Sequence, residues 1–166
     1  MNHLSRIVLV AAALGLAGCG FTPLYGTPEA GSPVALKLAS ITVVEQDNRL
    51  GQLVRNEIIS GVTPAGSPGG SAYRLELETR ASEEVAIDAI NTESLRQHYR
   101  ANVEFVLYDS QTGKPVYSGK TFSQVAYDRV DEPVANLQAQ VNAQERAARE
   151  TGQDIRTRLA AFMSSN

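Results

Sequence analysis

The sequence has little of the chemistry from which most metal and disulfide sites are made. Its 166 residues include one cysteine, two histidines and no tryptophan. One cysteine cannot close a disulfide within the chain, so the hydrophobic core has to hold the domain together. A structural metal site needs several histidines or cysteines at ligand spacing, whereas His3 and His98 stand far apart in the sequence. We therefore expect neither a disulfide nor a metal site.

Catalytic patterns are missing as well. No glycine-rich loop follows a strand and opens a helix, as phosphate binding requires. Serine and threonine are plentiful, but no histidine base accompanies them. Glu83 and Glu84 are neighbours on a predicted strand, so they point to opposite faces and cannot act as a paired acid and base. We interpret both as solvated charges, and we expect a protein that is not an enzyme and carries no cofactor.

An excess of basic charge and long apolar runs are also absent. Lysine and arginine number 15 against 18 acidic residues, a net charge of −3, which argues against a dedicated nucleic-acid binder. One stretch, residues 7–17, is apolar apart from a single glycine, and it is well short of the roughly 20 residues that span a bilayer as a helix. No later run approaches about 18 apolar residues, so the sequence predicts no transmembrane helix.

What is present at the N-terminus is the pattern of a secretory signal. Arg6 precedes the apolar stretch, which ends in Leu16, Ala17, Gly18 and Cys19. These four residues resemble the bacterial lipoprotein box. The resemblance implies cleavage between Gly18 and Cys19 and acylation of Cys19 with three chains, which anchor a protein far more firmly than one chain does. The alternatives are an ordinary cysteine near the end of a cleaved signal and an uncleaved anchor.

The residues after Cys19 predict where such a protein would be sorted and how its domain is attached. In enterobacterial lipoproteins an aspartate at the next position favours retention in the inner membrane. This chain has Gly20 there, which implies anchoring in the outer membrane on its periplasmic side. Residues 21–33 contain three prolines and two glycines, which exclude a helix or a central strand. We therefore expect a signal peptide at 1–18, a lipidated tether at 19–33 and one domain at 34–166.

Within the domain, strand and helix periodicities follow one another. An apolar stripe at Leu50, Leu53, Val54 and Ile58 predicts a helix that Asp47 or Asn48 can cap and Gly61 ends. Odd-numbered positions carry the apolar residues of two later strands, so the odd side of each is expected to face the core. The predicted elements are a strand at 34–44, a helix at 50–61, strands at 73–87, 99–107 and 116–127, and a helix of about 30 residues from Pro133.

A hairpin turn at residues 111–113 sets the register of the last two strands. A three-residue loop with Gly113 in the left-handed conformation places Glu104 opposite Lys120 on the outer face and Phe105 opposite Gly119 on the inner face. A two-residue turn would bury Lys120 against Phe105, so we choose the first register. The predicted fold is α+β, a two-layer sandwich with two helices on one face of a four-stranded, mostly antiparallel sheet, in the order β-α-β-β-β-α.

The outer face of this sheet gathers charges of both signs. Four cations are expected on it, Arg74, Arg80, Arg100 and Lys120, with Arg96 near its rim. Three glutamates lie among them, at positions 76, 78 and 104. Cross-strand ion pairing on a solvated face is the favoured interpretation. The alternative is a surface that docks a partner or holds an anionic headgroup, because arginine matches phosphate geometry.

A family resemblance joins these observations. The stretch from Leu16 to Gly26, LAGCGFTPLYG, resembles the mature start of the lipopolysaccharide-assembly lipoprotein family LptE in its alphaproteobacterial form. The end of the chain is also similar: Tyr127-Asp128, then acids, Pro133 and a helix rich in alanine, glutamate and arginine that ends near Phe162. The family fold has two helices on a four-stranded sheet, which agrees with the predicted element order.

The resemblance implies a function. Members of this family sit inside the outer-membrane β-barrel LptD as a plug, help it to fold, and take part in delivering lipopolysaccharide to the outer leaflet. Basic residues on an otherwise acidic domain would then meet lipid A phosphates, and Arg80, Arg100 and Lys120 are the candidates. The alternative is an auxiliary lipoprotein of an ABC-type lipid transporter. A purely structural envelope lipoprotein ranks below both, because the sequence has no peptidoglycan-binding feature.

Overall fold

A computed structural model of the chain describes residues 32–62, 71–85 and 95–165. The elements are α2 (Pro33–Ala39), β1 (Ile41–Val43), α3 (Arg49–Val62), β2 (Tyr73–Val85), β3 (Leu95–Asp109), β4 (Pro115–Arg129) and α4 (Pro133–Ser165). The predicted signal peptide, the cleavage position at Gly18, the acylated Cys19 and the tether as far as Gly31 lie outside the described residues.

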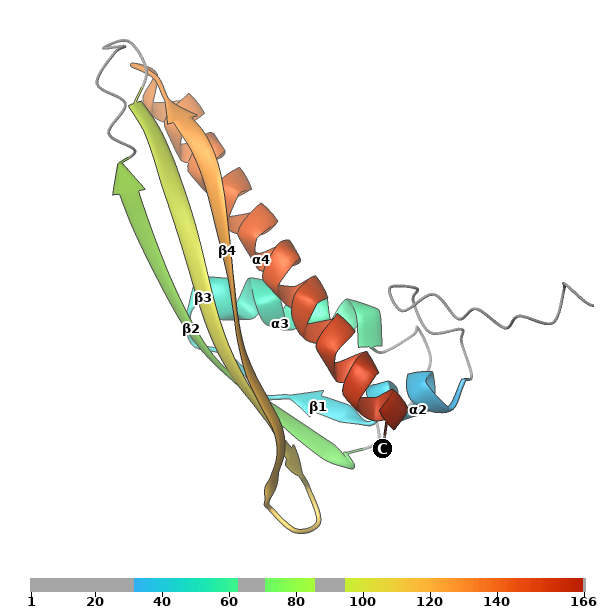
Figure 1. Cartoon of the computed structure of the whole chain (residues 1–166). Helices are drawn as coiled ribbons and strands as arrows, with labels where there is room; N and C mark the ends of the chain where they lie inside the picture. The colour runs from blue at the N-terminus through green and yellow to red at the C-terminus, as the bar shows by residue number, and fades with distance from the viewer. Residues whose placement is uncertain (1–31, 63–70, 86–94, 166) are drawn as a thin grey trace, which may run out of the picture.

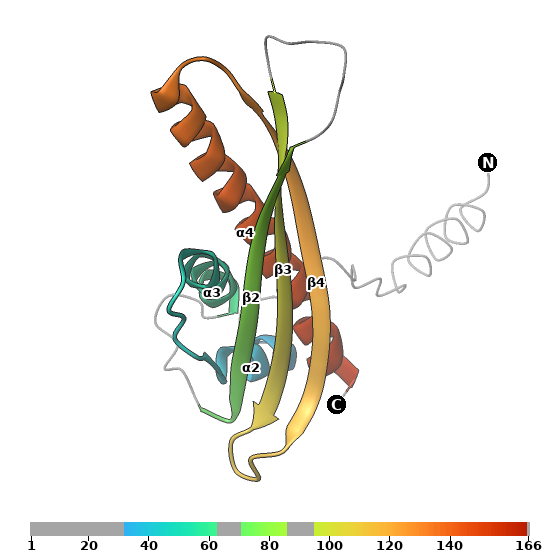
Figure 2. The same ribbon diagram turned by 90° about the vertical axis from the view of Figure 1, so that its left-hand side faces the viewer.

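The four strands lie in the order β1-β2-β3-β4, with β1 parallel to β2 and the other neighbours antiparallel. The helices all lie on one side of the sheet, here called the inner face (Figure 1). The opposite, outer face carries no helix of the described part (Figure 2). The predicted two-layer α+β fold on a mostly antiparallel four-stranded sheet is therefore confirmed, with a third, short helix in addition to the expected two.

The prediction of a strand over 34–44 is wrong for most of its length. Ser32 caps a helix there, because its Oγ accepts a hydrogen bond of 3.2 Å from the Ala35 N–H and Pro33 takes the first helical position. Leu38 is buried in this helix, whereas Leu36 is 62% exposed. Only Ile41–Val43 pair with the sheet, as a short parallel strand. The break in the alternation of apolar residues marks the junction of helix and strand.

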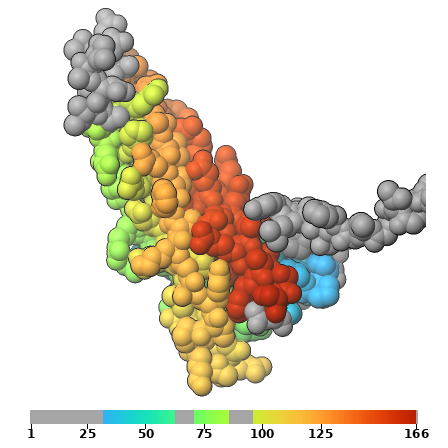
Figure 3. Space-filling view, viewed as in Figure 1, coloured from blue at the N-terminus to red at the C-terminus, as the bar shows by residue number. Residues whose placement is uncertain are grey.

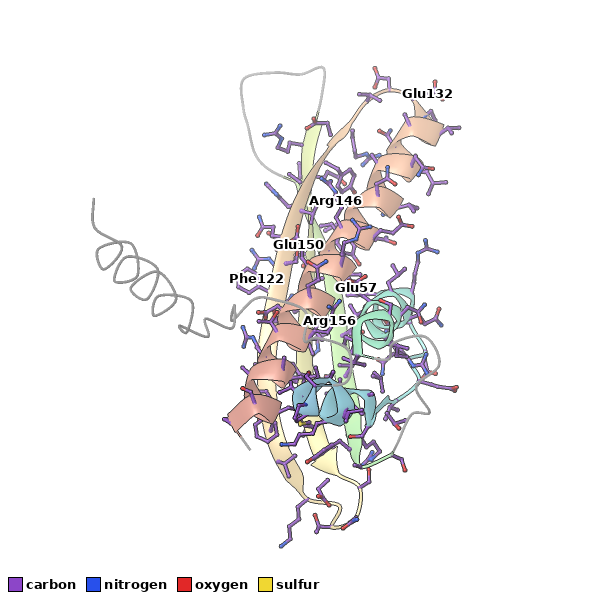
Figure 4. All side chains as sticks on the ribbon, turned by 90° about the vertical axis from the view of Figure 1, so that its right-hand side faces the viewer. Glu57, Phe122, Glu132, Arg146, Glu150 and Arg156 are labelled. Carbon is purple, nitrogen blue, oxygen red and sulfur yellow. The ribbon has the colours of Figure 1, made fainter. Side chains whose placement is uncertain are left out.

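The long helix packs closely on α3. The Asn48 Oδ1 accepts a hydrogen bond of 2.8 Å from the Gly51 N–H, so Asn48 is the cap of α3. Gly152 is buried where α4 meets α3, and a Cβ added there would lie 2.7 Å from the Cγ of Glu57. A salt bridge of 3.8 Å joins Glu57 to Arg156 across the same contact (Figure 4). This close approach fixes the two helices as one layer over the inner face.

The hairpin has the predicted register. Gly113 has φ +68°, Glu104 pairs with Lys120, and Phe105 pairs with Gly119. The odd-numbered residues of β3 are buried as expected: Tyr99, Ala101, Val103, Phe105 and Leu107. Phe105 occupies the space that a side chain on residue 119 would need, since a Cβ there would lie 2.6 Å from the ring.

One end of the sheet is covered only by the first turns of α4. At this end, called here the distal end, β2 finishes, β3 begins and β4 passes into α4 (Figure 1). Every residue of β2 from Arg80 to Val85 is exposed, so the strand is not half-buried along its whole length as predicted. The buried residues of α4 begin only at Ala143, and its first turns leave Val134 74% and Leu137 62% exposed.

Candidate functional surfaces

Most of the cations on the outer face are neutralised by neighbouring carboxylates. Arg74 pairs with Glu76 and Arg80 pairs with Glu78 along β2. Lys120 Nζ lies 2.8 Å from Glu104 Oε1, and this hydrogen bond is the main reason that the pKa of Glu104 falls below its usual range. The predicted cross-strand ion pairing is therefore confirmed for Lys120 and Glu104, whereas Arg74 and Arg80 pair with glutamates of their own strand.

Arg100 differs from the other cations on this face. Its Nη2 donates a hydrogen bond of 2.7 Å to the Gln124 side chain, and its buried Nε has no acceptor among the described residues. No carboxylate of the described part forms an ion pair with it. Of the three candidate lipopolysaccharide contacts, Arg100 is thus the one whose charge is not already compensated.

An apolar side chain stands among these charges. Phe122 is 68% exposed on β4, in the same cross-strand row as Asn102 and Arg80. The row that contains Arg100 and Gln124 is two residues further along the strands, so Arg100 lies diagonally across from Phe122 on the neighbouring strand. Figure 4 shows Phe122 projecting from the sheet away from α4. The outer face therefore combines an exposed apolar ring with charged side chains. The sequence analysis did not single out Phe122.

A second polar cluster lies on the inner face at the distal end. The Tyr127 hydroxyl lies 2.6 Å from Gln97 Oε1 and 3.2 Å from Glu83 Oε2, and Gln140 donates a hydrogen bond of 2.6 Å to Glu83 Oε1. Burial, followed by the charge of Glu83, raises the pKa of Tyr127, so the hydroxyl stays protonated and able to donate. Together with Leu137 these groups line an open pocket of about 260 Å³.

This cluster corrects the interpretation of Glu83 as a merely solvated charge. Glu83 and Glu84 do lie on opposite faces, because Glu83 pairs with Tyr99 and Glu84 with His98 in the sheet. However, Glu83 ties β2 to β4 and to α4, whereas no hydrogen bond or ion pair of Glu84 to the described residues is found. Sequence spacing could not reveal this, since the partners of Glu83 stand 44 and 57 residues away.

Arginines of α4 protect the edge of the sheet that β4 forms. On the β4 edge, Arg146 and Arg158 of α4 donate hydrogen bonds of 3.1 and 3.2 Å to the carbonyls of Ala126 and Lys120. The space-filling view shows α4 seated along β4 (Figure 3), and Figure 4 shows Arg146 and Glu150 on this part of the helix. Exposed strand edges invite pairing with other chains. The two arginines occupy acceptors that such pairing would need.

We expect the double variant Arg146→Ala/Arg158→Ala to self-associate. Each lost hydrogen bond from a charged donor is worth about 1.5 kcal/mol or more, so the association constant for edge pairing should rise at least about tenfold. Sedimentation velocity over a concentration series measures this. Arg149→Ala is the matched control, because Arg149 lies on the same helix and makes no described contact with the edge. Equal association of both variants would show that the arginines do not protect the edge.

The described residues contain no cluster of three or more histidine, cysteine, aspartate or glutamate side chains that could hold a metal ion. Over the same residues, no helix combines the length and the apolar composition needed to cross a membrane. The fold and its surfaces define a two-layer α+β domain that leaves one sheet face and one end open to other molecules.

Known structures share this architecture. The chain is similar to the crystal structure of a "putative lipoprotein" from Caulobacter crescentus CB15, with 31% identity and a TM-score of 0.66 over 80% of this chain and 97% of the other. The chain belongs to the family of that lipoprotein. A minor lipoprotein from Acinetobacter baumannii has the same fold, with a TM-score of 0.55 and 16% identity over 74% of this chain and 89% of the other. The sequence matches no protein-family model and no curated protein.

Proposed function

We propose that this protein is a lipid-anchored lipoprotein of the outer membrane that plugs an LptD-like β-barrel, assists its assembly and takes part in lipopolysaccharide delivery. Cys19 carries the anchor, and the domain stands on the periplasmic side beside its barrel. The barrel and lipopolysaccharide are the two partners.

Family membership is the observation that carries the proposal. A relative described as a "putative lipoprotein" matches 80% of this chain over 97% of its own length, and residues 16–19 supply the lipoprotein box. Residues 16–26 and the C-terminal helix resemble the LptE family. This resemblance favours a barrel plug over other kinds of lipoprotein. The uncovered outer face supports this role, because a plug needs surface that its own fold does not occupy.

The first test is to isolate the tagged, acylated protein from outer membranes in mild detergent and to identify what accompanies it by mass spectrometry. A large outer-membrane β-barrel in stoichiometric amount is the expected result. Subunits of an inner-membrane ABC transporter without a barrel would replace the proposal with the auxiliary-lipoprotein alternative.

For lipopolysaccharide contact, Arg100 is expected to matter most. Because no described carboxylate neutralises it, its charge is available to a phosphate, whereas Arg80 and Lys120 would first have to leave Glu78 and Glu104. A charge-assisted hydrogen bond contributes about 1.5–3 kcal/mol, so Arg100→Gln should weaken lipopolysaccharide binding about tenfold or more.

Binding is measured with purified lipopolysaccharide on the folded, detergent-solubilised protein. Arg96→Gln is the matched control, because Arg96 lies on the same strand and is paired with Asp128 at 3.2 Å. The triple variant at Arg80, Arg100 and Lys120 should bind more weakly than Arg100→Gln alone. Undiminished binding by a folded triple variant would exclude these three residues as contacts.

A further inference from the structure

The edge of the sheet formed by β2 is open over part of its length, whereas α4 protects the edge formed by β4. β1 pairs only with Tyr73, Arg74 and Leu75 of β2. Near Thr79, the Asn48 side chain approaches at 3.0 Å. Beyond Thr79, no described residue pairs with this edge, and none of the hydrogen bonds found there corresponds to those that Arg146 and Arg158 make with β4.

The pairing at the start of β2 shows which of its residues direct their backbone N–H and C=O groups toward this edge. The Tyr73 N–H donates to the Ser40 carbonyl, and the Leu75 carbonyl accepts from the Val44 N–H. Odd-numbered residues of β2 therefore direct their backbone groups toward β1, and the even-numbered ones toward β3. Since this direction alternates along a strand, Ala81, Glu83 and Val85 present unpaired N–H and C=O groups at the distal end.

Exposed aliphatic and mostly acidic side chains gather at the distal end, where this open edge lies. Four of the exposed large apolar residues in the described part lie at the distal end: Val85, Val130, Val134 and Leu137. The carboxylates of Glu83, Asp131 and Glu132 form no ion pair with a cation of the described residues. Glu83 lines the pocket that Leu137 and one cation, Arg129, also line, so acidic groups outnumber basic ones at this end. A segment that covers this surface would complement it with aliphatic and basic side chains.

The geometry points to strand addition: an extended segment of the partner barrel, carrying aliphatic and basic side chains, pairs with the Ala81–Val85 edge of β2. Main-chain hydrogen bonds supply the binding, and the side chains next to the edge supply the preference for one segment over another. This inference rests on the proposed function, because the segment belongs to the barrel named there.

Proline substitution tests the edge directly. Ala81→Pro removes one N–H that the added strand needs, while the strand itself tolerates it because that N–H has no partner within the described fold. Ala126→Pro is the matched control, since the even-numbered residues of β4 face its own, arginine-protected edge. In pull-downs from outer membranes, Ala81→Pro should retain at least tenfold less barrel than wild type, and Ala126→Pro about as much as wild type.

A charge pair of variants gives a second, independent readout. Glu83→Lys should repel a basic segment and lower the barrel recovered, whereas Glu84→Lys makes the same charge change on the opposite face and should leave it unchanged. Thermal unfolding of each variant establishes that it is folded. Amide exchange of the wild-type complex should show new protection over residues 79–85 relative to the free protein.

The results of these pull-downs distinguish a failure of the proposed function from a failure of strand addition. A wild-type protein that brings no barrel overturns both the proposed function and the strand addition. A wild-type protein that brings the barrel, with equal recovery by Ala81→Pro and Ala126→Pro or without protection of residues 79–85, overturns strand addition and leaves the barrel partnership standing.

Discussion

Phe105→Ala is expected to destabilise the domain by about 3–5 kcal/mol, the range for removing a fully buried phenylalanine. The ring is 1% exposed and fills the space above Gly119 on the neighbouring strand. Gly119→Ala in the wild-type background should cost about 1–3 kcal/mol through overpacking, because the new Cβ would lie 2.6 Å from the ring. The same glycine substitution in the Phe105→Ala background should instead be neutral or stabilising, since the methyl enters the vacated space.

Urea unfolding of the two single variants and the double variant, with unchanged slopes, measures this reversal of sign. Ser118→Ala is a suitable control, because residue 118 is exposed on the outer face and pairs with Val106 rather than with Phe105. If Gly119→Ala costs the same in both backgrounds, the ring is not what excludes a side chain at position 119.

The register of the hairpin could be predicted because three constraints agree. Gly113 supplies the left-handed residue, Glu104 and Lys120 require each other on the outer face, and Phe105 requires a small partner on the inner face. A shift by one residue would violate all three at once. The alternation in β3 and the Asp-Glu-Pro start of α4 were reliable for the same reason, since local preference and burial favour the same structure.

The segment before β1 was predicted wrongly because short apolar runs do not distinguish a strand from a helix. Val34, Leu36 and Leu38 alternate, but Ser32 and Pro33 form a helix start, and this signal could have decided the case. The exposure of the distal half of β2 could not be predicted from its alternation. It depends on where α3 begins, since its cap Asn48 contacts Thr79, and this position is set by packing between segments that are distant in the sequence.

Of the candidate site, the sequence predicted which cations share the outer face but not which of them are free. Arg80 and Lys120 have carboxylate partners that alternation already placed near them. The distinct position of Arg100 depends on Gln124, which lies 24 residues away across the hairpin. The protection of the β4 edge by Arg146 and Arg158 has no local sequence signal, because it requires α4 to lie along that strand.

Cys19→Ser should abolish lipid anchoring, the largest functional effect expected of any single change. Serine has no thiol, so no thioether lipid can form, and the precursor should keep residues 1–18 because the cleavage implied by the lipoprotein box acts on the acylated cysteine. Each buried CH₂ contributes about 0.8 kcal/mol of membrane affinity, and three chains are lost together. The variant should incorporate no labelled palmitate, and its mass should exceed that of a cleaved chain by residues 1–18.

Metabolic labelling and mass spectrometry of the N-terminal peptide check this result, with Gly20→Asp as the matched control. That variant keeps Cys19 and should still incorporate palmitate, but it should fractionate with the inner membrane, because aspartate after the cysteine favours retention there in enterobacterial lipoproteins. The pair therefore separates acylation from sorting. A wild-type protein that is cleaved elsewhere and carries no lipid would make Cys19 an ordinary residue of a secreted chain. The short tether would then no longer hold the domain beside the membrane, and the plug function would lose its physical basis.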